Sequence, residues 1–196
     1  MRNITAGYVE EIDVLNDVSL EVNEGAITGI IGANGAGKST ILKAIFGFLK
    51  PRRGKIIFQD QEIQGRQPYQ LKQMGISYML QEYSTCPQLS IQDNLLLGAW
   101  TFRNDKELVN ERLSEIYEFF PVLSERRAQK ATYLSGGYLR MLSVGKEIMS
   151  KPTLLMIDEP SVGLAPKIVT EIYDLLINVA KQGTTILIVD QNIMKA

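Results

Sequence analysis

One nine-residue segment, GANGAGKST at residues 32–40, constrains the fold of this chain more than any other. It matches the pattern G-x-x-x-x-G-K-[ST] and lies between a mostly apolar segment, 26–31, and a helix-like segment, STILKAIFGF. Its glycines allow backbone conformations that turn several N–H groups toward one concavity, and the start of the following helix favours negative charge there. The context favours a phosphate site over a plain glycine-rich turn.

Two side chains of this loop carry the expected chemistry. Lys38 supplies a positive charge for the outer phosphates, and the Ser39 hydroxyl can coordinate Mg²⁺. The loop therefore predicts a binding site for a nucleoside triphosphate. Its expected residues are Gly32, Ala33, Asn34, Gly35, Ala36, Gly37, Lys38, Ser39 and Thr40.

A carboxylate pair follows a second apolar segment. In LLMIDEP, Asp158 and Glu159 come directly after the predicted strand at 153–157. A carboxylate in this place can hold Mg²⁺, and its neighbour can orient or deprotonate an attacking water. A turn with a helix cap is the alternative, but the phosphate loop in the same chain favours Asp158 as a metal ligand and Glu159 as the base.

Composition excludes several classes of site and partner. The 196 residues include no histidine and one cysteine, Cys86, so a metal site built on imidazole or thiolate is excluded and a metal must be held by oxygen. A net charge of −1 argues against a nucleic-acid partner. Because the apolar runs are short, we expect no membrane span and a cytoplasmic protein.

Apolar spacing divides the rest of the chain into strands, then helices, then strands. A buried parallel strand is predicted at 26–31, and further strands are predicted at 18–22, 55–58, 76–80, 153–157 and 184–189. Between 82 and 146 the chain is predicted to be mostly helical, with one amphipathic helix ended by Pro121. Another amphipathic helix runs from about Ile168 to Val179. The pattern predicts an α/β core with an inserted helical subdomain.

The segment LSGGYLRMLSVGKEIM, which begins at Leu134, resembles the signature of the ATP-binding cassette (ABC) ATPases, and the resemblance extends over essentially the whole chain. It implies an α/β P-loop NTPase core with a mostly parallel sheet and an N-terminal antiparallel β subdomain. Residues 1–81 and 147–196 would form the nucleotide-binding core, and residues 82–146 the helical subdomain. The implied activity is ATP hydrolysis with Mg²⁺.

The resemblance also assigns roles to individual residues. Tyr8 is similar to the aromatic residue that stacks on adenine, with Val14 beside it. Gln81 resembles the glutamine that reaches Mg²⁺ and the attacking water, and Gln191 stands where most cassettes have a switch histidine. The signature residues Ser135, Gly136 and Gly137 are implied to bind the ATP of a second cassette, and residues 161–166 to contact it.

Departures from the usual pattern indicate one branch of the family. Tyr138 replaces the usual Gln or Glu, Ala165 stands where many cassettes have Asp, and Gln191 replaces His. The segments PSVGLAP and VDQN resemble the ATPase subunits of importers for branched-chain amino acids, or for urea and short amides. Further strands and a helix follow this point in the family, so we expect a chain shortened at its C-terminal end.

The implied partners are a second ABC ATPase subunit, identical or related, in a head-to-tail dimer, and integral membrane permease subunits. The protein is then expected on the cytoplasmic face of the membrane. The three departures motivate an alternative, a nucleotide-gated binding module with little hydrolysis, although Asp158, Glu159 and Gln81 are all present. A soluble ABC ATPase of DNA repair or translation is a further alternative, which the absence of room for a coiled-coil insertion disfavours.

Overall fold

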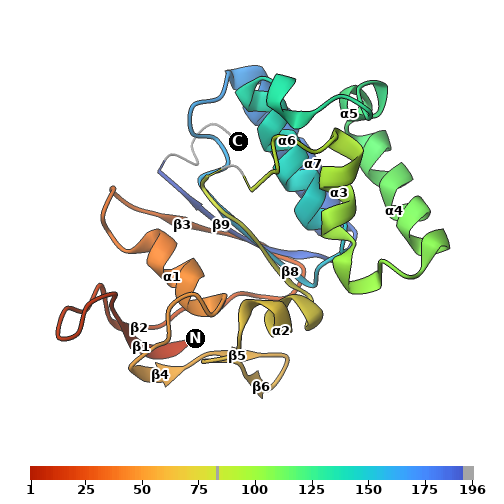
Figure 1. Ribbon diagram of the computed structural model, residues 1–196. Coiled ribbons are helices and arrows are strands. Elements are labelled where there is room, and N and C mark those ends of the chain that lie inside the picture. The colour runs from red at the N-terminus through yellow and green to blue at the C-terminus, as the bar shows by residue number, and fades with distance from the viewer. Residues whose placement is uncertain (83, 192–196) are drawn as a thin grey trace.

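A four-stranded parallel sheet forms the centre of the molecule in the computed structural model, which describes residues 1–82 and 84–191 (Figure 1). Its strands follow the order β3-β9-β8-β7. Their bounds are Ile27–Ile31 for β3, Ile76–Met79 for β7, Leu154–Asp158 for β8 and Thr185–Asp190 for β9. Ile31 pairs with Asp190, and Asp158 pairs with Val189. The carboxyl ends of these three strands therefore lie side by side, which brings the residues that follow them together.

The two central strands send alternate residues into two hydrophobic cores. Leu155, Ile157, Ile186 and Ile188 face one core, and their neighbours Leu154, Met156, Leu187 and Val189 face the other. This alternation is the period of two that an extended strand imposes. The first core contains residues of the helical part, and the second contains residues of the helix after the phosphate loop. Both faces of β8 and β9 are thus covered, as in a layered α/β fold.

Strand β3 lies at an edge of this sheet, and the prediction of full burial at 26–31 is wrong. Within the described residues β3 pairs with β9 alone, and Ile27 and Ile31 are 43% and 63% exposed. An apolar segment can form a strand at the edge or at the centre of a sheet, but it is fully buried only where strands pair with it on both sides. The strand itself was predicted correctly, and it pairs with β9.

The N-terminal part forms antiparallel sheets. Strands β1 (Arg2–Ala6), β2 (Leu15–Val18) and β4 (Arg53–Lys55) have the order β2-β1-β4, and β5 (Ile57–Phe58) pairs with β6 (Gln61–Glu62). The strand predicted at 18–22 is wrong, because β2 ends at Val18; Leu20 and Val22 pack on the core from irregular backbone. The strand predicted at 55–58 is split, because β4 and β5 pair with different strands.

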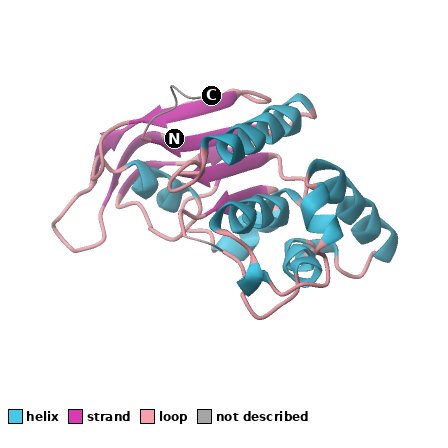
Figure 2. Ribbon diagram, turned by 90° about the horizontal axis from the view of Figure 1, so that it is seen from above, coloured by secondary structure: helices cyan, strands magenta, loops and turns pink. Residues whose placement is uncertain are grey.

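Seven α-helices are present in residues 1–82 and 84–191. They are α1 (Lys38–Ile45), α2 (Pro68–Gln73), α3 (Ile91–Gly98), α4 (Lys106–Phe119), α5 (Pro121–Glu125), α6 (Gly136–Ile148) and α7 (Pro166–Lys181), with short 3₁₀ helices at Trp100–Phe102 and Ala131–Tyr133. The predicted helix ended by Pro121 is α4. Viewed from above, one group of helices gathers to one side of the strands (Figure 2).

The boundaries of the helical subdomain stay a prediction. Helix α6 runs without a break through residue 146, where the predicted boundary lies. Across the described residues, no helix combines the length and the apolar character that crossing a membrane requires. The predicted fold class, with a parallel sheet, an N-terminal antiparallel part and helices, is confirmed.

Candidate active site

The phosphate loop connects the end of β3 to the start of α1. Gly35 and Gly37 have φ values of 80° and 86°, a left-handed conformation that glycine adopts without steric cost. Gly37 is the N-cap of α1 and offers no side chain to its first N–H groups, so these groups are left for an anion. The buried Lys38 donates hydrogen bonds from Nζ to the carbonyl oxygens of Gly32 (2.8 Å) and Ala33 (3.0 Å). The loop therefore has the form predicted from its glycines.

Asp158 lies beside the phosphate loop at the end of β8. The Ser39 hydroxyl donates to Asp158 Oδ1 at 2.9 Å, and the Tyr78 hydroxyl of β7 donates to Oδ2 at 3.0 Å. Burial raises the pKa of Asp158 above its usual value, and the two hydrogen bonds oppose that shift. Burial and the nearby Asp158 charge also raise the pKa of Tyr78, so its hydroxyl stays a donor. The expected metal ligands Ser39 and Asp158 are thus in direct contact.

Glu159 is held between the two predicted glutamines. Gln81 Nε2 donates to its Oε2 at 2.8 Å, and Gln191 Nε2 donates to its Oε1 at 3.1 Å. The backbone of Glu159 has a φ of 48°, rare for a residue with a side chain, and its N–H donates to Val189 O at 2.8 Å. The carboxylate is buried, so two amides and a constrained backbone fix its direction.

Tyr8 and Val14 lie beside the start of α1. The Tyr8 hydroxyl is 3.3 Å from Thr40 Oγ1, and the Lys43 ammonium lies 5.5 Å from the centre of the Tyr8 ring. Tyr8 is 55% exposed, and Val14 lies beside Gly37. An exposed aromatic ring next to the start of α1 can stack on a base whose phosphates occupy the loop.

The signature residues lie in another part of the molecule. Ser135 is the N-cap of α6, with an exposed side chain, and Gly136 and Gly137 form the first turn. Figure 1 shows α6 among the helices, apart from α1 and the phosphate loop. The structure thus gathers Lys38, Ser39, Gln81, Asp158, Glu159 and Gln191 around the ends of β3, β7, β8 and β9, and leaves the signature outside this group.

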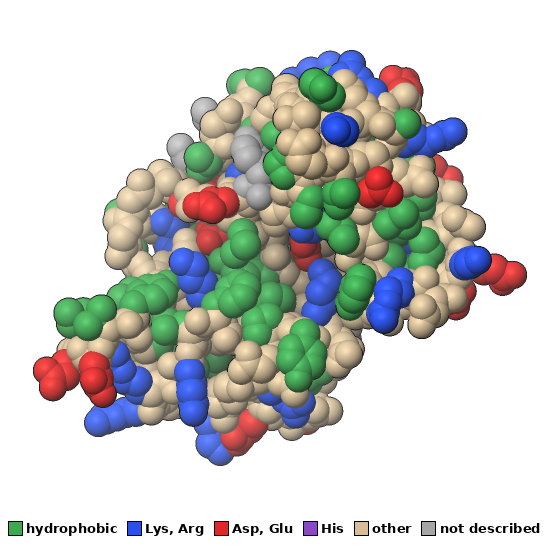
Figure 3. Space-filling model, in the orientation of Figure 1, with side chains coloured by type: hydrophobic (Ala, Val, Ile, Leu, Met, Phe, Trp, Pro, Cys, Tyr) green, Lys and Arg blue, Asp and Glu red, His purple; other side chains and the backbone are tan. Residues whose placement is uncertain are grey.

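In the space-filling view of this face, acidic and basic side chains lie close together between the N-terminal part and the helical part (Figure 3).

Two buried polar residues near the site, Tyr78 and Asp190, were not assigned from the sequence. Tyr78 holds Asp158, while Asp190 Oδ2 accepts from the Ser161 hydroxyl (2.8 Å) and from the Tyr173 hydroxyl (3.0 Å). Asp190 thereby ties the segment after Glu159 to the end of β9. Each of these bonds joins residues far apart in the sequence, so the only available signal was a polar residue within or at the tip of an apolar strand.

The comparison with known proteins identifies the family. Residues 15–162 match the model of the ABC transporter family. The chain belongs to this family. The predicted ABC cassette is confirmed, and since members of this family hydrolyse ATP to power transport, the predicted enzyme class is confirmed as well.

Similar cassettes match nearly the whole chain. BraG, a high-affinity branched-chain amino acid transport ATP-binding protein of Pseudomonas aeruginosa, is 37% identical, covering 96% of this chain and 80% of BraG. LivF of Archaeoglobus fulgidus, a probable branched-chain amino acid transport ATP-binding protein, is 35% identical, covering 98% and 81%. The solved structure of a nucleotide-free ATP-binding cassette from an ABC transporter has a TM-score of 0.86 at 30% identity, covering 98% and 81%.

One pH effect follows from the burial of Asp158. Because its pKa is raised in the folded ABC cassette, the protonated carboxyl stabilises the fold, and this contribution is lost as pH rises through the raised pKa. Asparagine does not titrate, so the Asp158→Asn variant does not lose this contribution. We therefore expect the free energy of unfolding of the variant to increase relative to that of the wild type as pH rises from acidic to neutral. Urea denaturation of both proteins without nucleotide or Mg²⁺ measures this difference. A difference that is constant with pH, or that moves the other way, contradicts it.

Proposed function

We propose that this ABC cassette binds ATP with Mg²⁺ at the phosphate loop and hydrolyses it with Glu159 as the general base. The observation that carries the proposal is the position of the Glu159 carboxylate, which two glutamine amides hold at the carboxyl edge of the sheet beside Ser39 and Asp158. Lys38 and the first N–H groups of α1 would bind the β- and γ-phosphates. Tyr8, with Val14, would stack on the adenine.

The donor set fits Mg²⁺. A serine hydroxyl and a carboxylate oxygen, 2.9 Å apart, are hard oxygen ligands, and Mg²⁺ is commonly held by one or two carboxylates together with substrate phosphates. Ser39 and Asp158 would hold the ion, together with the third predicted ligand, Gln81. When bound, the ion neutralises charge that develops on the phosphates.

Glu159 has the right properties to take the proton of the attacking water. It is buried, and the amides of Gln81 and Gln191 both donate to it, so its lone pairs are fixed in direction before substrate arrives. Gln191 stands where a histidine is usual and does not titrate near neutral pH, so proton transfer rests on the carboxylate alone.

A second cassette would complete the site. The exposed Ser135 with Gly136 and Gly137 opens helix α6 and offers N–H groups to a phosphate, yet lies apart from the phosphate loop of its own chain. A head-to-tail dimer, of identical or related subunits, would place it over the ATP of the partner. Closure on ATP and reopening after hydrolysis would then move the membrane permease that the dimer contacts.

We further propose that the transported solutes are branched-chain amino acids and that the direction is import. Support comes from BraG and LivF, both named for branched-chain amino acid transport. The cassette would sit on the cytoplasmic face of the membrane, held there by permease subunits.

Reconstitution tests this transport function. We expect the cassette to co-purify with its membrane permease subunits and to drive uptake of labelled leucine, isoleucine or valine in proteoliposomes. Glu159→Gln is the control, and it should abolish uptake. ATP turnover without uptake of any of the three amino acids would show that the solute has been assigned wrongly.

A further inference from the structure

A buried guanidinium of helix α6, that of Arg140, contacts the backbone at Gln81. Arg140 Nη1 donates to the carbonyl oxygen of Leu80 at 3.2 Å, and Nη2 donates to that of Gln81 at 2.8 Å. Arg140 is only 3% exposed. The two carbonyls belong to successive residues, so the fork of the guanidinium fixes the direction of this short stretch of backbone.

This backbone has little other regular support. Strand β7 ends at Met79, so Leu80 lies beyond the strand and Gln81 lies in a bend. The Gln81 side chain then reaches across to Glu159 at 2.8 Å. Two links therefore join α6 to the carboxylate: the guanidinium to the Gln81 backbone, and the Gln81 amide to Glu159.

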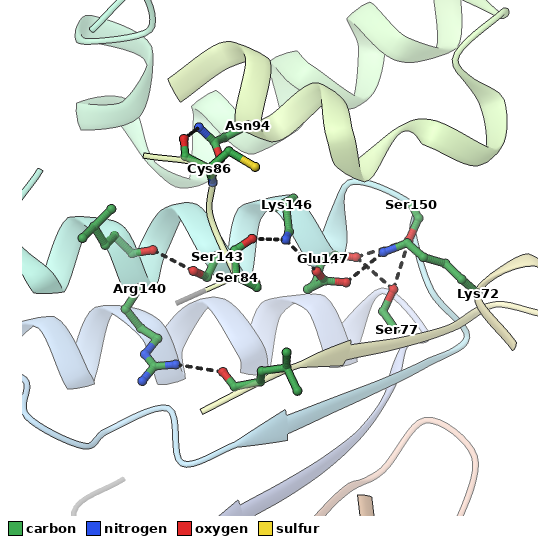
Figure 4. A network of polar contacts seen from close by, with 12 residues as sticks. Lys72, Ser77, Ser84, Cys86, Asn94, Arg140, Ser143, Lys146, Glu147 and Ser150 are labelled. Carbon is green, nitrogen blue, oxygen red and sulfur yellow. Dashed lines mark hydrogen bonds and ion pairs between the residues drawn. The ribbon is translucent and has the colours of Figure 1, made fainter. Parts of the chain in front are cut away.

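Helix α6 itself is fixed to the core by a second, independent set of contacts. The buried Glu147 accepts from Lys72 of α2 at 2.9 Å, and its backbone oxygen accepts from Ser77 of β7 at 3.3 Å. Lys146 donates to the backbone oxygen of Ser84 (Figure 4). These contacts hold α6 in place without Arg140, so removing the fork should loosen Gln81 without displacing the helix.

We propose that Arg140 is a positioning residue for ATP hydrolysis, which holds the Leu80–Gln81 backbone and through it the Gln81 amide on Glu159. The proposal rests on the function proposed for Glu159. Because the signature residue Ser135 is the N-cap of α6, the guanidinium connects the signature helix to the catalytic carboxylate. When a second cassette engages Ser135 and shifts α6, Arg140 and Gln81 transmit the shift to Glu159.

Rate and binding measurements on Arg140 variants test this role in the full-length chain. We expect Arg140→Met to lower kcat for ATP by at least about 10-fold, since small misplacement of catalytic groups is costly, with little change in KM or in ATP affinity. Arg140→Lys, a single point donor, should recover part of the rate. Ser143→Ala is the matched control, because within residues 1–82 and 84–191 this buried hydroxyl of α6 bonds only to Leu139 O of its own helix, and its rate should equal that of the wild type.

A double-mutant cycle separates this role from a merely structural one. If Arg140 acts through Gln81, adding Arg140→Met to Gln81→Ala should change kcat by less than about two-fold. A full additional loss in that background overturns the proposal, and so does an Arg140→Met rate equal to the wild type. If Arg140→Met does not fold, the same cycle with Arg140→Lys decides. Glu159→Gln in the same assay distinguishes the two proposals. If this variant turned over ATP at the wild-type rate, the proposed function of Glu159 would be wrong, whatever the role of Arg140.

Discussion

Replacing Glu159 by glutamine is expected to lower ATP turnover by about 10²- to 10⁴-fold, the range in which a positioned general base contributes. Glutamine has nearly the shape of glutamate, so it should leave the buried pocket between Gln81 and Gln191 filled. It cannot take a proton from water, however, and its amide nitrogen cannot accept the bond that a carboxylate oxygen accepts. ATP affinity should stay near that of the wild type, because phosphate binding belongs to the loop and Lys38.

Phosphate release and ATP titration by calorimetry measure the two quantities separately. Glu171→Gln is the matched control, because Glu171 is an exposed carboxylate on α7 and its removal should change neither quantity. Turnover of Glu159→Gln at the wild-type rate would mean that another group is the base.

Replacing Lys38 by alanine should weaken ATP binding by about 10- to 100-fold, the usual effect of losing hydrogen bonds to a charged group. The ammonium lies against the loop carbonyls of Gly32 and Ala33, at the mouth of the concavity that would hold the outer phosphates. Its loss removes the one full positive charge that the loop sequence 32–40 carries. Turnover should fall as well, because the same charge stabilises the transferred phosphate.

Titration of a fluorescent ATP analogue measures this effect. Lys181→Ala serves as the control, since Lys181 is an exposed lysine in the last turn of α7. Equal affinity for the wild type and Lys38→Ala would place the phosphates somewhere other than the loop.

The parts of the site that the sequence predicted share one property. The loop, Asp158 and Glu159 depend on local patterns, in which glycines permit positive φ and a polar pair follows an apolar strand. Gln81 and Gln191 could be placed only by resemblance, and the structure brings both amides onto Glu159. Their position depends on how the ends of β7 and β9 flank β8, which no local pattern contains.

The predictions that were wrong and the residues that were missed depend on contacts that local sequence patterns do not contain. The apolar composition of 26–31 is typical of a central strand and of an edge strand alike, so it could not predict the exposure of this segment. The alternation of apolar and polar residues at 18–22 comes from irregular backbone that packs Leu20 and Val22 on the core. Arg140 looks like any basic residue of an amphipathic helix, and its contact with the Gln81 backbone joins positions 59 residues apart. Long-range contacts of this kind follow from packing rather than from local sequence.

The most direct test of the central claim is phosphate release by the wild-type cassette, assembled with its permease and partner cassette, with and without Mg²⁺. The account predicts release that saturates with ATP, requires Mg²⁺, and falls by about 10²- to 10⁴-fold in Glu159→Gln. ATP binding in the presence of Mg²⁺ without any phosphate release would contradict it and would favour a nucleotide-gated binding module.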